Sequence, residues 1–182
     1  TSNNSNSVPN LAGSGQLPNT PADYKPLLRA LIIAMDQWIK DGKEPPPSVY
    51  PRISDGTLVG WKQKESGWPT IPGVSYPTVI HEPQQLFRGP DWLTKRIATI
   101  EPPESKGRYV VKIPAIGKDG NELGTLLHPA VAVPIGSYTA WNLRSEAIGA
   151  PGELLSLAGG YIPFAKTAEV RKASGEERPA LL

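Results

Sequence analysis

The sequence predicts an α+β protein that is loop- and proline-rich, with one long core helix, short mostly antiparallel strands and a short C-terminal helix. One long run near the N-terminal end repeats apolar residues at helical spacing. Several short runs of β-branched residues are separated by turn signals. The chain holds 18 glycines and 21 prolines in 182 residues. That share is well above average and favours turns and short strands over a helical bundle.

Composition excludes several classes of function. The 19 basic and 17 acidic residues give a net charge of +2, which is too balanced to favour a nucleic-acid partner. Because the chain has no cysteine, it has no disulfide, no thiolate nucleophile and no cysteine-based zinc site. The longest apolar stretch, residues 27–35, is broken by Arg29 and is too short to span a bilayer. We therefore expect no nucleic-acid partner, no membrane span, and no metal or other cofactor.

The first 42 residues divide into a polar segment and a helix. Residues 1–19 are rich in Asn, Ser, Gly and Pro, which predicts a flexible tail or a long surface loop. Residues 23–41 then follow a helical pattern, with Thr20 or Asp23 as the cap and Gly42 as the stop. The apolar residues of this helix form a broad stripe: Leu27, Leu28, Leu31, Ile32, Met35, Trp38 and Ile39. The stripe predicts a core-packing helix that needs a substantial partner surface.

The middle of the chain is predicted to be extended and rich in loops. Residues 44–51, with the sequence EPPPSVYP, are typical of polyproline-type chain. We interpret them as a rigid connector, with an SH3-type ligand as the alternative. Residues 52–59 read as two short extended pieces joined at Asp55 and Gly56. Frequent prolines and glycines over residues 60–90 predict loops and short strands.

The second half predicts strands, a turn and a final helix. The strand candidates are residues 96–101, 108–116, 123–127 and 131–138. The sequence KDGN at 118–121 is a strong turn signal. Residues 147–160 are compatible with a turn or a short helix. A last helix is predicted over residues 167–174, with Gly175 as its stop.

The sequence contains no recognisable catalytic centre. His81 lies in a proline-rich loop and His128 precedes a proline at a predicted strand edge, so we interpret both as structural or surface residues. There is no G-x-S-x-G nucleophile elbow and no glycine-rich phosphate loop. Glu101 and Glu104 flank two prolines on one short turn, whereas a glycosidase needs two carboxylates across a cleft. No catalytic residue is assigned.

Aromatic residues are the remaining candidates for a binding role. One group lies in loop-rich sequence, where it stacks on sugars or packs under the loops: Trp61, Trp68 and Trp92. A second group follows a predicted strand and supplies the candidates for a substrate pocket: Tyr138, Trp141 and Asn142. Packing of the rings and local capping by the asparagine form the alternative interpretation of this second group.

Four segments carry a family resemblance: residues 23–59, which begin DYKPLLRALIIAMDQWIK, 71–77 (IPGVSYP), 133–144 (VPIGSYTAWNLR) and 159–181 (GGYIPFAKTAEVRKASGEERPAL). In this order they resemble a family of large bacterial proteins described as α/β-hydrolase domain proteins. The resemblance covers nearly everything from residue 20 onward. It implies an α/β-hydrolase-type fold in the full-length context, and a carboxylic ester hydrolase with a serine, a histidine and an acid as its triad.

The resemblance further implies that this chain is the C-terminal portion of such an enzyme. The nucleophile and the acid would lie upstream, and the catalytic histidine would lie shortly before residue 20, where the polar segment contains none. Residues 20–42 would be a helix that packs on the hydrolase sheet, and residues 43–182 a C-terminal extension. The expected partner is the remainder of the hydrolase domain, in the same precursor or as a separate chain.

Two other functions stay open at this point. One is a stand-alone proline-rich β domain that binds carbohydrate or protein, which predicts a closed core and a row of exposed tryptophans. The other is a structural or assembly protein whose extended arms pack against neighbours in a homo-oligomer. The hydrolase hypothesis predicts that residues 43–182 alone leave the apolar stripe of the first helix uncovered, whereas the stand-alone domain predicts a closed core.

Overall fold

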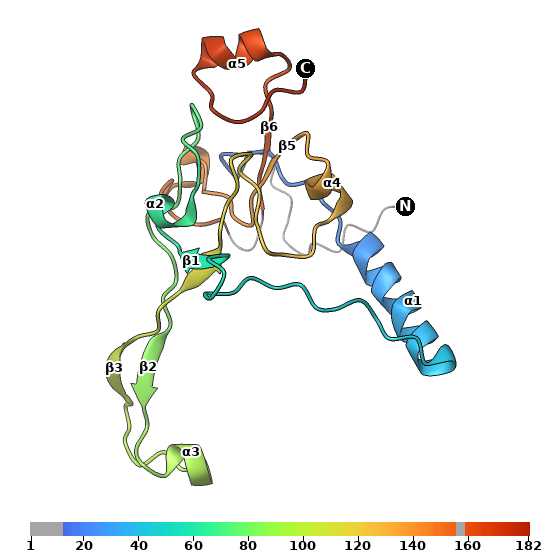
Figure 1. Ribbon diagram of the computed structural model, residues 1–182. Coiled ribbons are helices and arrows are strands. Elements are labelled where there is room, and N and C mark those ends of the chain that lie inside the picture. The colour runs from blue at the N-terminus through green and yellow to red at the C-terminus, as the bar shows by residue number, and fades with distance from the viewer. Residues whose placement is uncertain (1–12, 156–158) are drawn as a thin grey trace. The chain divides into compact units, whose positions relative to one another are not determined.

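The computed structural model describes residues 13–155 and 159–182, which fall into two units (Figure 1). The larger unit comprises the described parts of Thr1–Val79 and Ile113–Leu182, and the smaller unit is Ile80–Lys112. Most of the predicted N-terminal tail lies outside the described residues. The described chain is α+β as predicted, with short helices and short strands around one long helix.

The long helix α1, Lys25–Asp41, confirms the predicted first helix. Tyr24 takes the N-cap position without a side-chain bond, so neither predicted residue caps the helix in the usual way. Asp23 instead accepts a hydrogen bond at Oδ1 from the amide of Lys25, 3.1 Å away. At the other end Gly42 has a φ of 69° and donates its amide hydrogen to the carbonyl four residues earlier, as expected of a C-terminal glycine.

The apolar stripe of α1 is exposed. No residue of the helix is buried. Leu27 is half-buried, and the other stripe residues are exposed, from 48% at Leu28 to 75% at Ile39. Between these extremes lie Leu31, Ile32, Met35 and Trp38. Burial of one such side chain stabilises a fold by roughly 1.5–3 kcal/mol. The described part of residues 43–182 does not provide the surface that this helix needs.

Three two-stranded sheets hold the described strands. The pairs are β1 (Leu58–Gly60) with β4 (Lys112–Pro114), β2 (Gln84–Phe87) with β3 (Glu104–Arg108), and β5 (Gly136–Tyr138) with β6 (Tyr161–Pro163). The last two pairs are antiparallel. Both β4 and β6 end on a proline, which lacks the amide hydrogen needed to extend a ladder.

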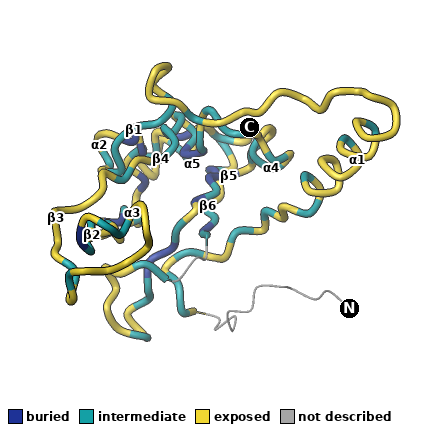
Figure 2. The backbone as a smooth tube through the Cα atoms, turned by 90° about the horizontal axis from the view of Figure 1, so that it is seen from below, coloured by how far each residue is buried: buried dark blue, intermediate teal, exposed yellow. Residues whose placement is uncertain are grey.

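A small aromatic core lies in the larger unit. Its buried residues are Trp68, Ile71 and Ile162, and the partly buried side chains packed on them include Leu17, Tyr76 and Trp141. The ring centroids of Trp68 and Trp141 are 5.4 Å apart at an interplanar angle of 60°, close to an edge-to-face contact. Figure 2 shows buried backbone along β5 and β6, so this strand pair belongs to the best-packed part of the unit.

The smaller unit consists of the β2–β3 hairpin and the single-turn helix α3, Trp92–Lys95. The predicted strand at 96–101 is wrong. Arg96 has a φ of 60° and ends α3 with its amide bonded to the carbonyl of Trp92, a left-handed conformation that no strand contains. The predicted strand at 108–116 is only partly right, because β3 ends at Arg108 and β4 covers Lys112–Pro114 alone.

Two further strand predictions need correction in the larger unit. Residues 131–138 begin in the helix α4, Pro129–Ala132, and only their last three residues form β5. The helix forms because Pro129 suits its first turn and the ring of His128 accepts the amide hydrogen of Ala130. Residues 123–127 form no strand. The only strand pairing next to them in the described chain is an isolated bridge between the preceding Glu122 and Ile116.

The turn and terminal-helix predictions are confirmed. Gly120 in the KDGN turn has a φ of 76° and Gly56 a φ of 74°, the left-handed conformation that glycine adopts without strain. The last helix, α5, spans Ala168–Ser174, with Thr167 accepting the amide hydrogen of Val170 and Gly175 as its stop. The remaining helices are α2, Gln63–Ser66, and the 3-10 helix η1, Glu146–Ile148, the latter at the start of the ambiguous stretch.

Candidate functional site

Tyr138, a predicted pocket residue, lines a cavity of about 140 Å³ in the larger unit. We call it the Glu122 cavity. Its polar lining residues are Glu122, Thr125, His128 and Tyr138, and its apolar wall is made of Leu126, Leu127 and Val131. The cavity therefore combines a carboxyl group, two hydroxyl groups and an imidazole with an aliphatic surface, and it is smaller than the roughly 300–1,000 Å³ of sites for drug-sized ligands.

The turn before β5 positions both sides of this cavity. Asn121 is buried, and its Oδ1 accepts a hydrogen bond from the amide of Tyr138 at 2.9 Å. Its Nδ2 donates to Asp119 Oδ2 at 2.9 Å and to Gly136 O at 3.2 Å. The side chain thus ties the KDGN turn to β5 and fixes the adjacent Glu122. The sequence predicted the turn but not this bond to the strand, which depends on residues far away along the chain.

Burial shapes the acid–base chemistry of the cavity. It raises the pKa of Glu122, and no described basic side chain counters this effect. The pKa of Tyr138 is also raised, chiefly by burial and secondly by Tyr161, whose ring centroid lies 5.2 Å away. A carboxyl group with a raised pKa keeps its proton to a higher pH than usual and can then donate a hydrogen bond.

His128 is held by the start of α4. Its Nδ1 accepts a hydrogen bond from the amide of Ala130 at 3.1 Å, so the neutral ring carries its proton on Nε2. That Nε2 atom is buried and has no hydrogen-bond partner among the described residues. The histidine therefore caps a helix, as the structural interpretation predicts, and also leaves one buried donor unsatisfied.

The other two pocket candidates lie in a different environment. Asn142 is fully buried, and its side chain bonds the backbone of Leu17. Trp141 packs on Trp68 and Tyr76, with centroid distances of 5.4 and 5.6 Å. The structure therefore places one of the three predicted residues at the cavity and two in the packing around the core. Their assignment to a substrate pocket remains a prediction.

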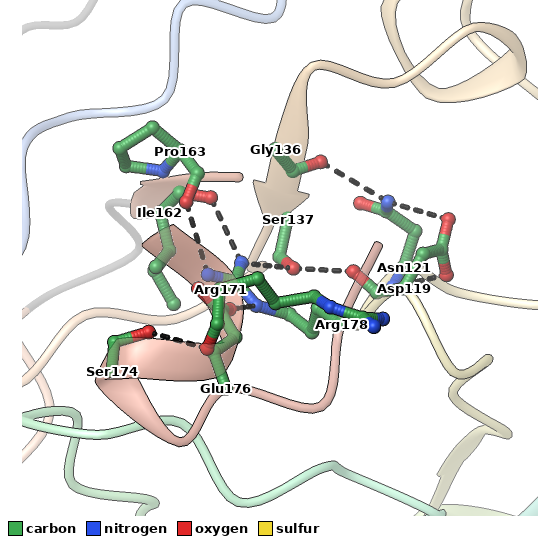
Figure 3. A network of polar contacts seen from close by, with 10 residues as sticks. All are labelled: Asp119, Asn121, Gly136, Ser137, Ile162, Pro163, Arg171, Ser174, Glu176 and Arg178. Atoms are coloured by element: carbon green, nitrogen blue, oxygen red, sulfur yellow. Dashed lines mark hydrogen bonds and ion pairs between the residues drawn. The ribbon is translucent and has the colours of Figure 1, made fainter. Parts of the chain in front are cut away.

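A buried arginine, Arg178, forms the densest polar network near β5 and β6 (Figure 3). Its guanidinium donates to Ser137 Oγ at 2.7 Å, to the carbonyl oxygens of Ile162 and Pro163 at 3.0 Å each, and pairs with Glu176. Ser137 Oγ in turn donates to Asp119 O at 2.5 Å. The network fastens the C-terminal segment to the strand pair.

Sequence reasoning missed Arg178. The local sequence EERP reads as an exposed charged tail, and charged residues are almost never fully buried unless they are paired. Its burial follows only from the fold, which brings the carbonyl oxygens of Ile162 and Pro163 within hydrogen-bond distance of the guanidinium.

The remaining candidates from the sequence do not assemble into a catalytic group. His81 is exposed in the smaller unit, and Glu101 and Glu104 each pair with a neighbouring basic residue. The serines that are buried, Ser66 and Ser137, bond to backbone or to non-histidine side chains. Across residues 13–155 and 159–182, no serine hydroxyl is hydrogen-bonded to a histidine.

The tryptophans do not form the exposed row that a carbohydrate-binding surface requires. Trp68 is 6% exposed and belongs to the core. Trp61 is half-buried, and its carbonyl accepts a hydrogen bond from the Tyr76 hydroxyl. Trp92 is half-buried in the smaller unit, with the guanidinium of Arg88 5.1 Å from its ring centroid. Packing explains all three positions.

The part of the chain that the structure describes offers neither a metal site nor a membrane-spanning helix. It holds no group of three or more His, Cys, Asp or Glu side chains suited to a metal ion. None of its helices combines the length and the apolar character needed to cross a bilayer. The Glu122 cavity and the Arg178 network therefore stand as the main polar features of the larger unit.

Comparison with known proteins supplies the family. A family profile described as "Alpha/beta hydrolase domain" matches residues 2–173, nearly the whole chain. No curated protein and no solved structure matches the chain. The extent of the profile match agrees with the resemblance carried by the four segments, which together span residues 23–181. The chain belongs to the alpha/beta hydrolase domain family.

Proposed function

We propose that this chain is the non-catalytic, C-terminal part of a carboxylic ester hydrolase whose serine, histidine and acid lie on other residues. Family membership supports a hydrolase. In such an enzyme the serine attacks the ester carbonyl, the histidine acts as its base, and backbone amides stabilise the oxyanion. The 182 residues contribute packing surface through α1 and, around Tyr138, Trp141 and Asn142, part of a pocket wall.

The uncovered face of α1 carries the proposal. At about 100° per residue, the stripe together with Ala34 spans an arc of about 160° on the helix surface. Arg29, Asp36 and Lys40 lie on the opposite side. A narrow seam would favour a coiled-coil partner, but a broad arc suits a helix laid on a sheet or in a deep groove. The hydrolase hypothesis expects this exposure, whereas a stand-alone domain would cover the arc itself.

The state of the histidines supports the absence of a triad from the described residues. In a serine hydrolase the base accepts the proton of the nucleophile at one ring nitrogen and is oriented through the other. His128 uses Nδ1 to cap α4, and its Nε2 makes no hydrogen bond with the described residues. His81 is exposed in the smaller unit and makes no hydrogen bond to a serine. Neither ring is arranged as a base.

An active-site probe tests the proposal directly. The purified 182-residue chain and the complete product of its gene are each incubated with a fluorophosphonate, which reacts with activated serines, and with p-nitrophenyl butyrate. We expect the complete product to be labelled on a serine outside these residues and to release p-nitrophenol, while the 182-residue chain does neither. Labelling of a serine within the 182 residues, or no labelling of the complete product, would contradict the proposal.

A further inference from the structure

The carboxylate of Glu122 is unusual among the acidic groups of the described chain. Five of them are half-buried, and the other four each have a polar or charged partner: Glu82 with Arg108, Asp91 with Lys95, Asp119 with Asn121, and Glu176 with Arg178. Only the Glu122 carboxyl group forms no hydrogen bond and no ion pair with the described residues, and burial is accordingly the cause of its raised pKa. An unpaired, partly desolvated carboxylate is costly, and proteins keep such groups chiefly where they serve a site.

The surroundings of Glu122 determine which charge would satisfy it. The cavity is lined by the hydroxyl-bearing Thr125 and Tyr138 and by aliphatic side chains, but by no lysine or arginine. His128 also lines it, but its Nδ1 accepts the amide hydrogen of Ala130, which is a role of the uncharged ring. An ionised Glu122 repels an anion and attracts a cation. The phenol ring of Tyr138 adds a surface that also favours positive charge. A ligand cation is therefore the complementary charge that the protein does not supply.

The volume limits the size of the ligand. At about 140 Å³ the cavity is close to the roughly 150 Å³ that holds a benzene molecule in a protein interior. We propose that the Glu122 cavity binds a small primary alkylammonium ion, whose nitrogen pairs with the Glu122 carboxylate and whose carbon chain lies on the aliphatic wall. The inference does not rest on the proposed hydrolase function, because binding is measured without turnover.

A series of ligands with the same carbon chain tests the charge requirement on the unmodified protein. Calorimetric titrations with n-butylammonium chloride, n-butanol and sodium butyrate are performed in an amine-free buffer at constant ionic strength. We expect saturable binding of butylammonium, binding of butanol weaker by about tenfold or more, and no binding of butyrate. Equal binding of butanol and butylammonium, or no saturable binding of butylammonium, overturns the proposal.

A pair of charge variants locates the site. Glu122→Gln keeps the size and removes the charge of the proposed ligand pair, so butylammonium should bind at least about tenfold more weakly. Glu153→Gln removes one charge at an exposed position outside the cavity and should leave the affinity unchanged. An equal loss in both variants, or no loss in Glu122→Gln, overturns the assignment. Thermal unfolding shows that each variant is folded, and the ligand series decides the question if one is not.

Discussion

The side chain of Asn142 holds the backbone of Leu17 by two hydrogen bonds, across 125 residues of sequence. Oδ1 accepts from the Leu17 amide at 3.1 Å, and Nδ2 donates to the Leu17 carbonyl at 2.8 Å. This arrangement imitates one rung of a strand ladder. Gly15 lies so close to the asparagine that a Cβ atom there would collide with it. Residues 13–20 are thus part of the fold of the larger unit.

We predict that Asn142→Ala destabilises the protein by about 2–4 kcal/mol, because two backbone groups of Leu17 lose their partner at a fully buried position. Urea unfolding followed by tryptophan fluorescence measures the change. Ser75→Ala, at an exposed position, is the control and should change the free energy of unfolding by less than about 0.5 kcal/mol. An Asn142→Ala variant as stable as the control would show that Leu17 finds other partners.

Replacement of Arg178 should be more damaging. Arg178→Met leaves Glu176, whose side chain is 10% exposed, without its counter-charge and frees the acceptors on Ile162 and Pro163. Loss of one partner of a buried ion pair costs about 3–5 kcal/mol. Chemical unfolding measures the loss of stability. Amide hydrogen exchange should be faster at Leu181 and Leu182, whose amides bond to the carbonyl oxygens of Ala165 and Lys166 just after β6.

A second substitution separates the charge from the packing. Addition of Glu176→Gln to Arg178→Met removes the unpaired carboxylate, so the double variant should recover part of the lost stability. If the double variant is less stable than Arg178→Met alone, the cost lies in the lost packing of Arg178, whose guanidinium carbon lies 5.3 Å from the ring centroid of Phe164.

Two exposed positions on opposite sides of α1 test the docking of this helix. Leu31 and Ile33 are 52% and 59% exposed, so an aspartate at either should change the stability of the 182-residue chain equally little. In the complete gene product, Leu31→Asp should reduce the free energy of unfolding by at least roughly 1.5–3 kcal/mol, the contribution of one buried leucine, and should also reduce fluorophosphonate labelling. Ile33→Asp should have a much smaller effect. Equal effects in the complete product would refute docking through the arc.

The raised pKa of Glu122 predicts that this group's contribution to the stability of the fold decreases as the pH rises. Burial raises this pKa above the ordinary value of 4.5, so the folded protein holds the proton more tightly than the unfolded chain. This contribution to stability is complete below pH 4.5 and is lost as pH rises through the folded-state pKa. Glu122→Gln should therefore gain in melting temperature relative to the wild type between pH 4 and pH 7. Glu153→Gln, which removes one carboxyl group at an exposed position, is measured beside it as the control for the change in net charge.

Local signals in the sequence were enough for the elements that local chemistry determines. The helix at 25–41 follows from its apolar periodicity and Gly42, and α5 follows from Thr167 and Gly175. The KDGN turn follows from Gly120. In each case the residues that decide the structure lie within one or two turns of chain, so pattern and propensity suffice.

Long-range contacts explain what the sequence did not predict. Residues 131–138 have the composition of a strand, but a proline and a histidine cap turn their first part into α4. The sequence could not show that the Asn142 side chain holds the backbone of Leu17, because that partner is 125 positions away. Arg178 and Glu122 carry no local mark at all, because the burial of one and the cavity around the other are made by segments that meet only after folding.

The separation of Leu17 and Asn142 in the sequence also affects when the contact can form during synthesis. Ribosomes add about 5–20 residues per second, so a gap of 125 residues corresponds to roughly 6–25 seconds of synthesis. During that interval residues 13–20 have already been made, while the asparagine that holds them does not yet exist. We therefore expect residues 13–20 to take their final place in the larger unit only after Asn142 has left the ribosome.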